Sequence, residues 1–160
     1  MTAASSAVTI ELQCVSQAEG IPEERDFYRW VSAALAGRHQ QAEVVIRVVD
    51  ELESAHLNKT YRNKAGATNV LSFPFEAPEQ VEMELLGDLV LCAPVIENES
   101  IQQHKTIESH WAHMTVHGVL HLLGYDHLHN DQAVKMESLE TEILTSMGYK
   151  APYADETESN

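Results

Sequence analysis

The sequence has little of three features that would mark other classes of protein: long hydrophobic runs, cysteine and glycine or proline. No apolar run approaches the roughly 20 residues needed to cross a bilayer. The first eight residues carry neither a basic segment nor an apolar one, so we expect no secretory signal. The two cysteines, Cys14 and Cys92, lie far apart in apolar stretches, which predicts buried thiols in a reducing cytoplasm rather than a disulfide framework. Seven glycines and five prolines in 160 residues exclude a collagen or a low-complexity chain.

Basic residues are also scarce. Ten Lys and Arg against 25 Asp and Glu give a formal net charge of −15. This balance argues against a protein that coats nucleic acid, because duplex binding depends on neutralising phosphates. However, Lys59, Arg62 and Lys64 fall within six residues. Such a local basic island can hold a phosphate, although composition alone leaves open a solvated turn with three ordinary surface cations.

The remaining composition suits one globular domain, which we expect over residues 1–152, followed by an acidic, disordered tail over 153–160. The hydrophobic pattern predicts four strands and four or five helices in mixed order, which implies an α+β fold with a small mixed sheet. Pro74 should end its strand or confine it to a sheet edge. The helix over 51–58 is expected to turn Leu52, Ala55 and His56 inward. The predicted strands cover 8–13, 44–49, 70–75 and 85–92. The predicted helices cover about 21–37, 51–58, 94–103, 106–123 and 131–147. We expect a polar loop over 61–68 and an acidic hairpin-like excursion over 76–84.

Histidine is concentrated: seven of the nine lie between His104 and His129. His117 and His121 are four residues apart, so on a helix both rings project from one face, one turn apart. Gly124 can then end the helix in the left-handed conformation and turn the chain back, so that His127 supplies a third nitrogen. Three imidazoles that leave a fourth position open are typical of a catalytic zinc site. The alternative is a set of core or surface histidines with hydrogen-bonded side chains.

The other histidines of this region are not expected to be ligands. His110 and His113 lie on roughly the same helix face and are expected to support the site, to line its cavity or to be exposed. His104 and His129 are expected at the surface.

The histidine offsets match the metzincin peptidase pattern, except at one position. In that pattern a Glu follows the first histidine and serves as general base. Here that position is Gly118, so peptide hydrolysis by the usual route is not expected.

Three blocks of sequence resemble the YbeY endoribonucleases, the zinc-dependent rRNA maturation factors of bacteria. The first runs from His117 to His127, the second from Leu57 through Lys64 into Thr68–Pro74, and the third from Leu86 to Cys92. One departure is Asn69, where the family usually has Asp, which puts an acid/base role for this position in doubt.

The resemblance implies a zincin-like α+β fold, one Zn²⁺ per chain on His117, His121 and His127, and cleavage of single-stranded RNA. It implies a setting in maturation of the 3′ end of small-subunit (16S) rRNA and in ribosome quality control. It also implies an essential Arg62, and as partners the small ribosomal subunit, a small-subunit ribosomal protein and an Era-type GTPase. No membrane partner is expected.

Several roles follow from residue chemistry. Arg62 can bind two phosphate oxygens at once and stabilise charge in the transition state, and Lys59 and Lys64 can contact phosphates as point charges. Asp126 could orient an imidazole, and Asp88 is a second candidate for a supporting or general-base carboxylate. For Asp88 the alternative is a plain buried hydrogen-bond role. The nucleophile, water or the RNA 2′-hydroxyl, stays open. Two other functions also stay open: a non-catalytic ribosome-assembly factor with a structural metal, and an atypical zinc peptidase.

Overall fold

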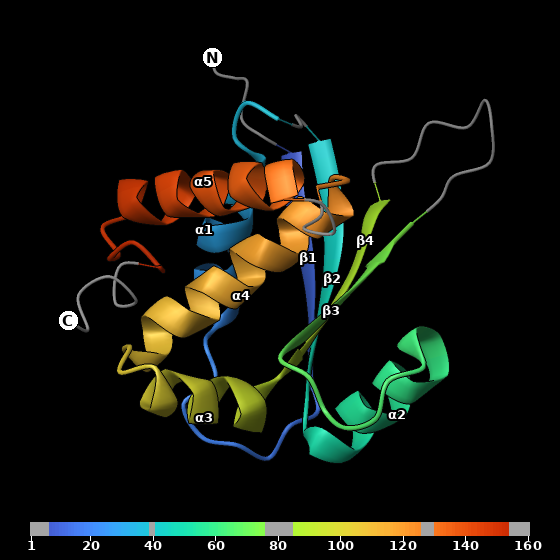
Figure 1. Cartoon of the computed structure of the whole chain (residues 1–160). Helices are drawn as coiled ribbons and strands as arrows, with labels where there is room; N and C mark the ends of the chain where they lie inside the picture. The colour runs from blue at the N-terminus through green and yellow to red at the C-terminus, as the bar shows by residue number, and fades with distance from the viewer. Residues whose placement is uncertain (1–6, 39–40, 76–84, 126–129, 154–160) are drawn as a thin grey trace.

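The computed structural model describes residues 7–38, 41–75, 85–125 and 130–153. Four strands and five helices lie within these residues. Figure 1 shows how they are arranged. The strands are β1 (Ala7–Cys14), β2 (Gln41–Val49), β3 (Val70–Pro74) and β4 (Leu85–Cys92), and the helices are α1 (Glu24–Leu35), α2 (Glu51–Arg62), α3 (Ala93–Gln102), α4 (Ile107–Leu122) and α5 (Asn130–Ser146).

The strands form one mixed sheet in the order β1-β2-β4-β3. β1, β2 and β4 run parallel, and β3 pairs antiparallel with β4 at the edge. Pro74 ends β3, as expected, because proline has no backbone N–H to donate to a ladder. The α+β class and the small mixed sheet are therefore confirmed.

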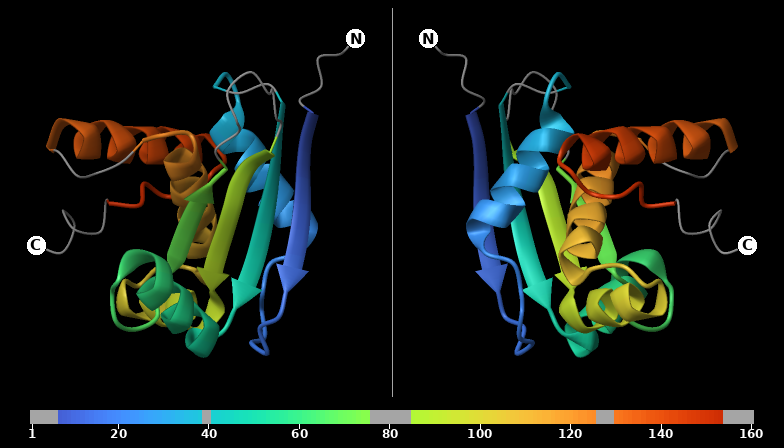
Figure 2. Two further views of the ribbon diagram at one scale, coloured as in Figure 1. Left: turned by 90° about the vertical axis from the view of Figure 1, so that its right-hand side faces the viewer. Right: turned by 90° about the vertical axis from the view of Figure 1, so that its left-hand side faces the viewer.

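One face of the sheet is covered by α1 and α4, which bury most of the core (Figure 2). Phe27 lies edge-on to both Trp30 and Trp111, and all three side chains are buried. Helix α4 is buried along most of its length. At Gly118 it approaches the sheet so closely that a Cβ would lie 2.7 Å from Leu89 Cδ2.

The opposite face of the sheet carries α2, and here two predictions are wrong. The helix continues to Arg62 and ends at Asn63, whose left-handed φ of 55° closes it, so the predicted loop over 61–68 begins two residues too early. The buried side chains of α2 are Ser54 and Asn58, whereas Leu52 is 87% exposed.

Polar contacts explain why Ser54 and Asn58, rather than Leu52, face inward. Ser54 exchanges hydrogen bonds with the backbone of Thr68, and Asn58 donates to the carbonyl of Gly66. The inner side of α2 therefore holds the chain that leads into β3. His56 is exposed and Ala55 half-buried, so the predicted inward triplet is not formed.

Cys92 is buried, as predicted, but Cys14 is exposed at the end of the edge strand β1, so that half of the cysteine prediction is wrong. Both are free thiols. The predicted excursion over 76–84 and residues 154–160 of the predicted tail lie outside the described residues. Within the described chain, no helix has both the length and the apolar character to span a bilayer.

Candidate active site

His117 and His121 lie on one face of α4, with ring centroids 4.7 Å apart. Both rings line a cavity of about 560 Å³ between α4, β3 and α5. The helical spacing of four residues therefore brings two imidazoles to one site, as predicted from the sequence. The third expected ligand, His127, and its neighbour Asp126 lie outside the described residues.

Glu140 of α5 is a carboxylate partner of His117. Its side chain is 1% exposed, and Oε2 lies 2.8 Å from His117 Nδ1. Burial opposes ionisation of this carboxyl group, but hydrogen bonds from His113 and His117 outweigh it and hold the pKa of Glu140 well below its usual value. Because an ionised carboxylate can only accept, the ring N–H groups donate to it.

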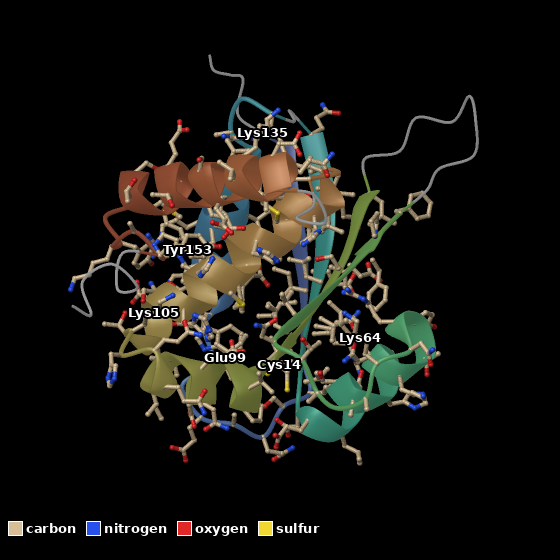
Figure 3. The ribbon with its side chains drawn as sticks, in the orientation of Figure 1. Cys14, Lys64, Glu99, Lys105, Lys135 and Tyr153 are labelled. Atoms are coloured by element: carbon tan, nitrogen blue, oxygen red, sulfur yellow. The ribbon has the colours of Figure 1, made fainter. Side chains whose placement is uncertain are left out.

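The second oxygen of Glu140 is also occupied. Oε1 accepts from His113 Nε2 at 2.6 Å and from the Tyr153 hydroxyl at 2.6 Å. Burial lowers the pKa of His113 despite the opposing effect of Glu140. Figure 3 labels Tyr153 beside α4, where the chain returns after α5. His113 thus contacts the same carboxylate that holds His117.

Arg62 reaches the same cavity from the last turn of α2. The edge strand β3 makes this possible because it packs directly on α4: Ser72 Oγ donates to the carbonyl of Gly118 at 3.2 Å. The chain between α2 and β3 is held by Ser54 and Asn58. An exposed guanidinium and two imidazoles therefore face one cavity from different elements.

A second polar cluster adjoins the first through Asn69. The Asn69 amide donates to both carboxylate oxygens of Glu99, at 3.1 and 3.2 Å, and Glu99 Oε1 accepts from His110 Nε2 at 2.8 Å. Burial opposes ionisation of Glu99, but the hydrogen bonds from His110 and Asn69 prevail and lower its pKa. Asn69 and Tyr153 line both the main cavity and a neighbouring one of about 470 Å³, which Glu99 and Lys105 also line (Figure 3).

Three predicted residues are not brought into the main cavity. Asp88 is exposed on the sheet face opposite α4, beside Glu11, and burial, followed by the charge of Glu11, raises its pKa. Asp88 therefore lies away from the two histidines, because alternate residues of β4 point to opposite faces. Lys59 and Lys64 are exposed, and neither lines the cavity; Lys59 Nζ donates to Asn63 Oδ1 at 3.3 Å.

Glu140, Glu99 and Tyr153 were missed in the sequence analysis. For Glu140 a signal exists: the buried residues Met136 and Leu144 lie four positions before and after it, so a carboxylate stands on the apolar face of its helix. For Glu99 and Tyr153 no comparable signal exists, because their partners come from distant segments.

The sequence matches the family described as Endoribonuclease YbeY over residues 13–148. The chain belongs to the YbeY endoribonuclease family. This match supports an enzyme that hydrolyses RNA. The fold is similar to the solution structure of TM1509 from Thermotoga maritima, with a TM-score of 0.55 and 22% identity, over 85% of this chain and 91% of that one. At this identity the similarity concerns the fold alone.

The donor chemistry of this YbeY-family site fits a metal ion. A histidine that donates Nδ1–H to a carboxylate presents Nε2 as ligand, which is the usual arrangement around zinc, and His117 has such a partner in Glu140. No group of three His, Cys, Asp or Glu side chains in the described part of the chain is arranged to hold a metal. His117 and His121 thus supply two donors of a site whose expected third donor lies outside the described residues.

Proposed function

We propose that this protein is a zinc-dependent endoribonuclease that cleaves single-stranded RNA. Its setting is maturation of the 3′ end of 16S rRNA and ribosome quality control. The observation that carries the proposal is the cavity that Arg62 shares with His117 and His121. The family supports RNA hydrolysis, and the histidine spacing supports a metal.

In this proposal one Zn²⁺ is held by His117, His121 and His127. When bound, the metal supplies Lewis-acid polarisation of a phosphoryl oxygen and activation of water. Asp126 is proposed to orient one of these imidazoles. The domain that carries the activity is zincin-like and covers residues 1–152.

Arg62 is the proposed catalytic residue of the chain. Its planar guanidinium can donate to two phosphate oxygens at once and stabilise the negative charge that grows on them during cleavage. Lys59 and Lys64, on and just after the last turn of α2, would attract the flanking phosphates of the strand. They lie outside the cavity, which suits contacts with the RNA on either side of the reacting group.

The partners that fit this function are single-stranded rRNA and the small ribosomal subunit, with a small-subunit ribosomal protein and an Era-type GTPase. Contacts with ribosomal proteins suit an acidic chain, because they do not require a basic surface. We propose a cytoplasmic location on the same grounds.

The experiment compares the wild-type protein with His121→Ala from parallel, nuclease-free preparations. The wild type should hold about one zinc per chain and cut a single-stranded RNA oligomer, and the variant should lose both tight zinc binding and cleavage. A 2′,3′-cyclic phosphate product end would identify the RNA 2′-hydroxyl as nucleophile. Equal zinc content or equal cleavage in the two proteins would refute the proposal.

The same preparations test the other two functions. Zinc binding without any RNA cleavage would favour a non-catalytic assembly factor with a structural metal. Chelator-sensitive digestion of casein that follows the protein through several columns would favour a peptidase. Gly118 argues against the peptidase, because it removes the general base of that mechanism.

A further inference from the structure

Glu140 touches one of the two histidines of the proposed zinc site and is buried on an otherwise apolar helix face. We propose that Glu140 is a positioning residue that holds the His117 ring in the tautomer and orientation a metal ion requires. The inference rests on the proposed function, since it takes His117 to be a zinc ligand.

The first step is the contact itself. Glu140 Oε2 lies 2.8 Å from His117 Nδ1, and the Glu140 side chain is 1% exposed. A hydrogen bond of a charged acceptor, shielded from water, constrains a ring more strongly than a solvated one. The carboxylate therefore holds the His117 ring at Nδ1, and the other ring nitrogen, Nε2, points away from Glu140.

The second step is the anchoring of the carboxylate. Oε1 accepts from His113 Nε2 and from the Tyr153 hydroxyl, both at 2.6 Å. These donors come from one turn earlier on α4 and from the chain after α5, so Glu140 cannot swing away from His117. Both its oxygens are already engaged in the described structure.

The third step concerns the proton. Because the Glu140 carboxylate is an acceptor only, the His117 ring must keep its proton on Nδ1, and its lone pair then lies on Nε2. A metal binds the imidazole nitrogen that carries the lone pair, and a hydrogen bond from the other nitrogen to a carboxylate fixes that tautomer. Glu140 thus prepares the donor atom before any metal arrives.

Glu140→Gln tests this with almost no change in shape. The amide has one acceptor atom, and the two donors from His113 and Tyr153 favour placing its oxygen at their end. The NH₂ group then faces His117 Nδ1, which must become an acceptor, so the ring proton moves to Nε2. We expect the Zn²⁺ dissociation constant to rise about 10- to 100-fold.

The matched control is Glu137→Gln. Glu137 lies one turn earlier on α5 and lines the same cavity, but it is exposed. The control removes the same charge at a similar place without removing the contact with His117. Zn²⁺ affinity is measured for the whole chain by competition with a chromophoric chelator. A dissociation constant for Glu140→Gln within about twofold of that for Glu137→Gln would overturn the proposal.

A spectroscopic readout separates positioning from a merely structural role. ¹⁵N-detected histidine spectra of the metal-free chain should place the His117 proton on Nδ1 in the wild type and on Nε2 in Glu140→Gln. The wild-type measurement alone decides the matter if the variant fails to fold: a proton on Nε2 in the wild type would refute the proposal.

The outcomes also distinguish this inference from the proposed function. If the wild type binds Zn²⁺ and both variants bind it equally, only the positioning role fails. If the wild type binds no Zn²⁺, the proposed metal site fails, and the role of Glu140 fails with it.

Discussion

Arg62 offers the cavity a guanidinium whose geometry a lysine cannot reproduce, because a planar fork meets two phosphate oxygens whereas an ammonium is a point charge. Arg62→Ala should reduce RNA cleavage about 100-fold or more, as removal of one preorganised donor does. The side chain is exposed, so zinc content and melting temperature should not change. Arg62→Lys should recover only part of the rate. Single-turnover cleavage measures these rates, and near-normal cleavage by Arg62→Ala would remove the catalytic role.

Asn69 and Glu99 form a hydrogen-bonded pair that a single substitution can test. Asn69→Asp would set a second carboxylate against Glu99 and replace a donor by an acceptor. The free energy of unfolding at pH 7 should fall by about 1–3 kcal/mol. Urea denaturation measures this loss.

The loss of stability in Asn69→Asp should depend on pH, and the sign of that dependence follows from the pKa shifts. In the wild type the lowered pKa of Glu99 contributes stability that is present above the unfolded value, about 4.3, and lost as pH falls through the folded value. In Asn69→Asp one of the two carboxyl pKa values is raised instead, so the penalty shrinks as acid protonates that group. The loss should therefore be smaller near pH 4 than at pH 7. The same loss in a Glu99→Gln background would contradict the pairing.

At the scale of elements, the close contact of α4 with the sheet depends on Gly118. Ala is normally the better helix former by about 1 kcal/mol. Here a Cβ would lie 2.7 Å from Leu89 Cδ2 and 3.2 Å from Val70 Cγ2, so Gly118→Ala should instead destabilise the fold by about 1–3 kcal/mol. Chemical denaturation checks the sign.

A second substitution separates the crowding of Gly118 from other causes. Leu89→Ala makes room for the added methyl group, so the double variant should lose less stability than the sum of the two single variants. Strict additivity would show that the contact at Leu89 does not limit this position.

The same scale explains which elements the sequence could predict. All four strands and the buried helix α4 follow from their apolar patterns, because their side chains enter the two hydrophobic clusters of the fold. The inner face of α2 could not be predicted in this way. Ser54 and Asn58 face inward to hold the backbone before β3, and a hydrophobic pattern carries no sign of that.

The candidate site, like the fold, was predictable only in part. The spacing of His117 and His121 is a local property of a helix, so it was predictable, and the structure brings both to one cavity with Arg62. The partner of His117, Glu140, was only partly predictable, because the sequence shows it as a glutamate on an apolar helix face. Tyr153 is part of the site through a hydrogen bond from the chain after α5 to Glu140, which no local pattern encodes.

At the scale of the whole molecule, a net charge of −15 must be reconciled with a polyanionic substrate. The cations proposed to meet RNA are few: Arg62 in the cavity, and Lys59 and Lys64 just outside it. The acidic remainder of the surface repels phosphates, which would limit binding to one short stretch of strand and disfavour duplex wrapping.

This charge distribution predicts a weak salt dependence of RNA binding. For single strands the slope of log K against log salt is about −0.7 per neutralised phosphate, so three contacts should give a slope of about −2. Affinity for a single-stranded RNA oligomer is measured over a salt series, with chelator present to prevent cleavage. Lys64→Ala should make the slope shallower by about 0.7. Arg25→Ala is the matched control, because Arg25 is an exposed cation of α1, paired with Glu23, and should leave the slope unchanged. Equal effects of the two substitutions would mean that the RNA does not follow the end of α2, and a slope several times steeper would require phosphate contacts beyond these three cations.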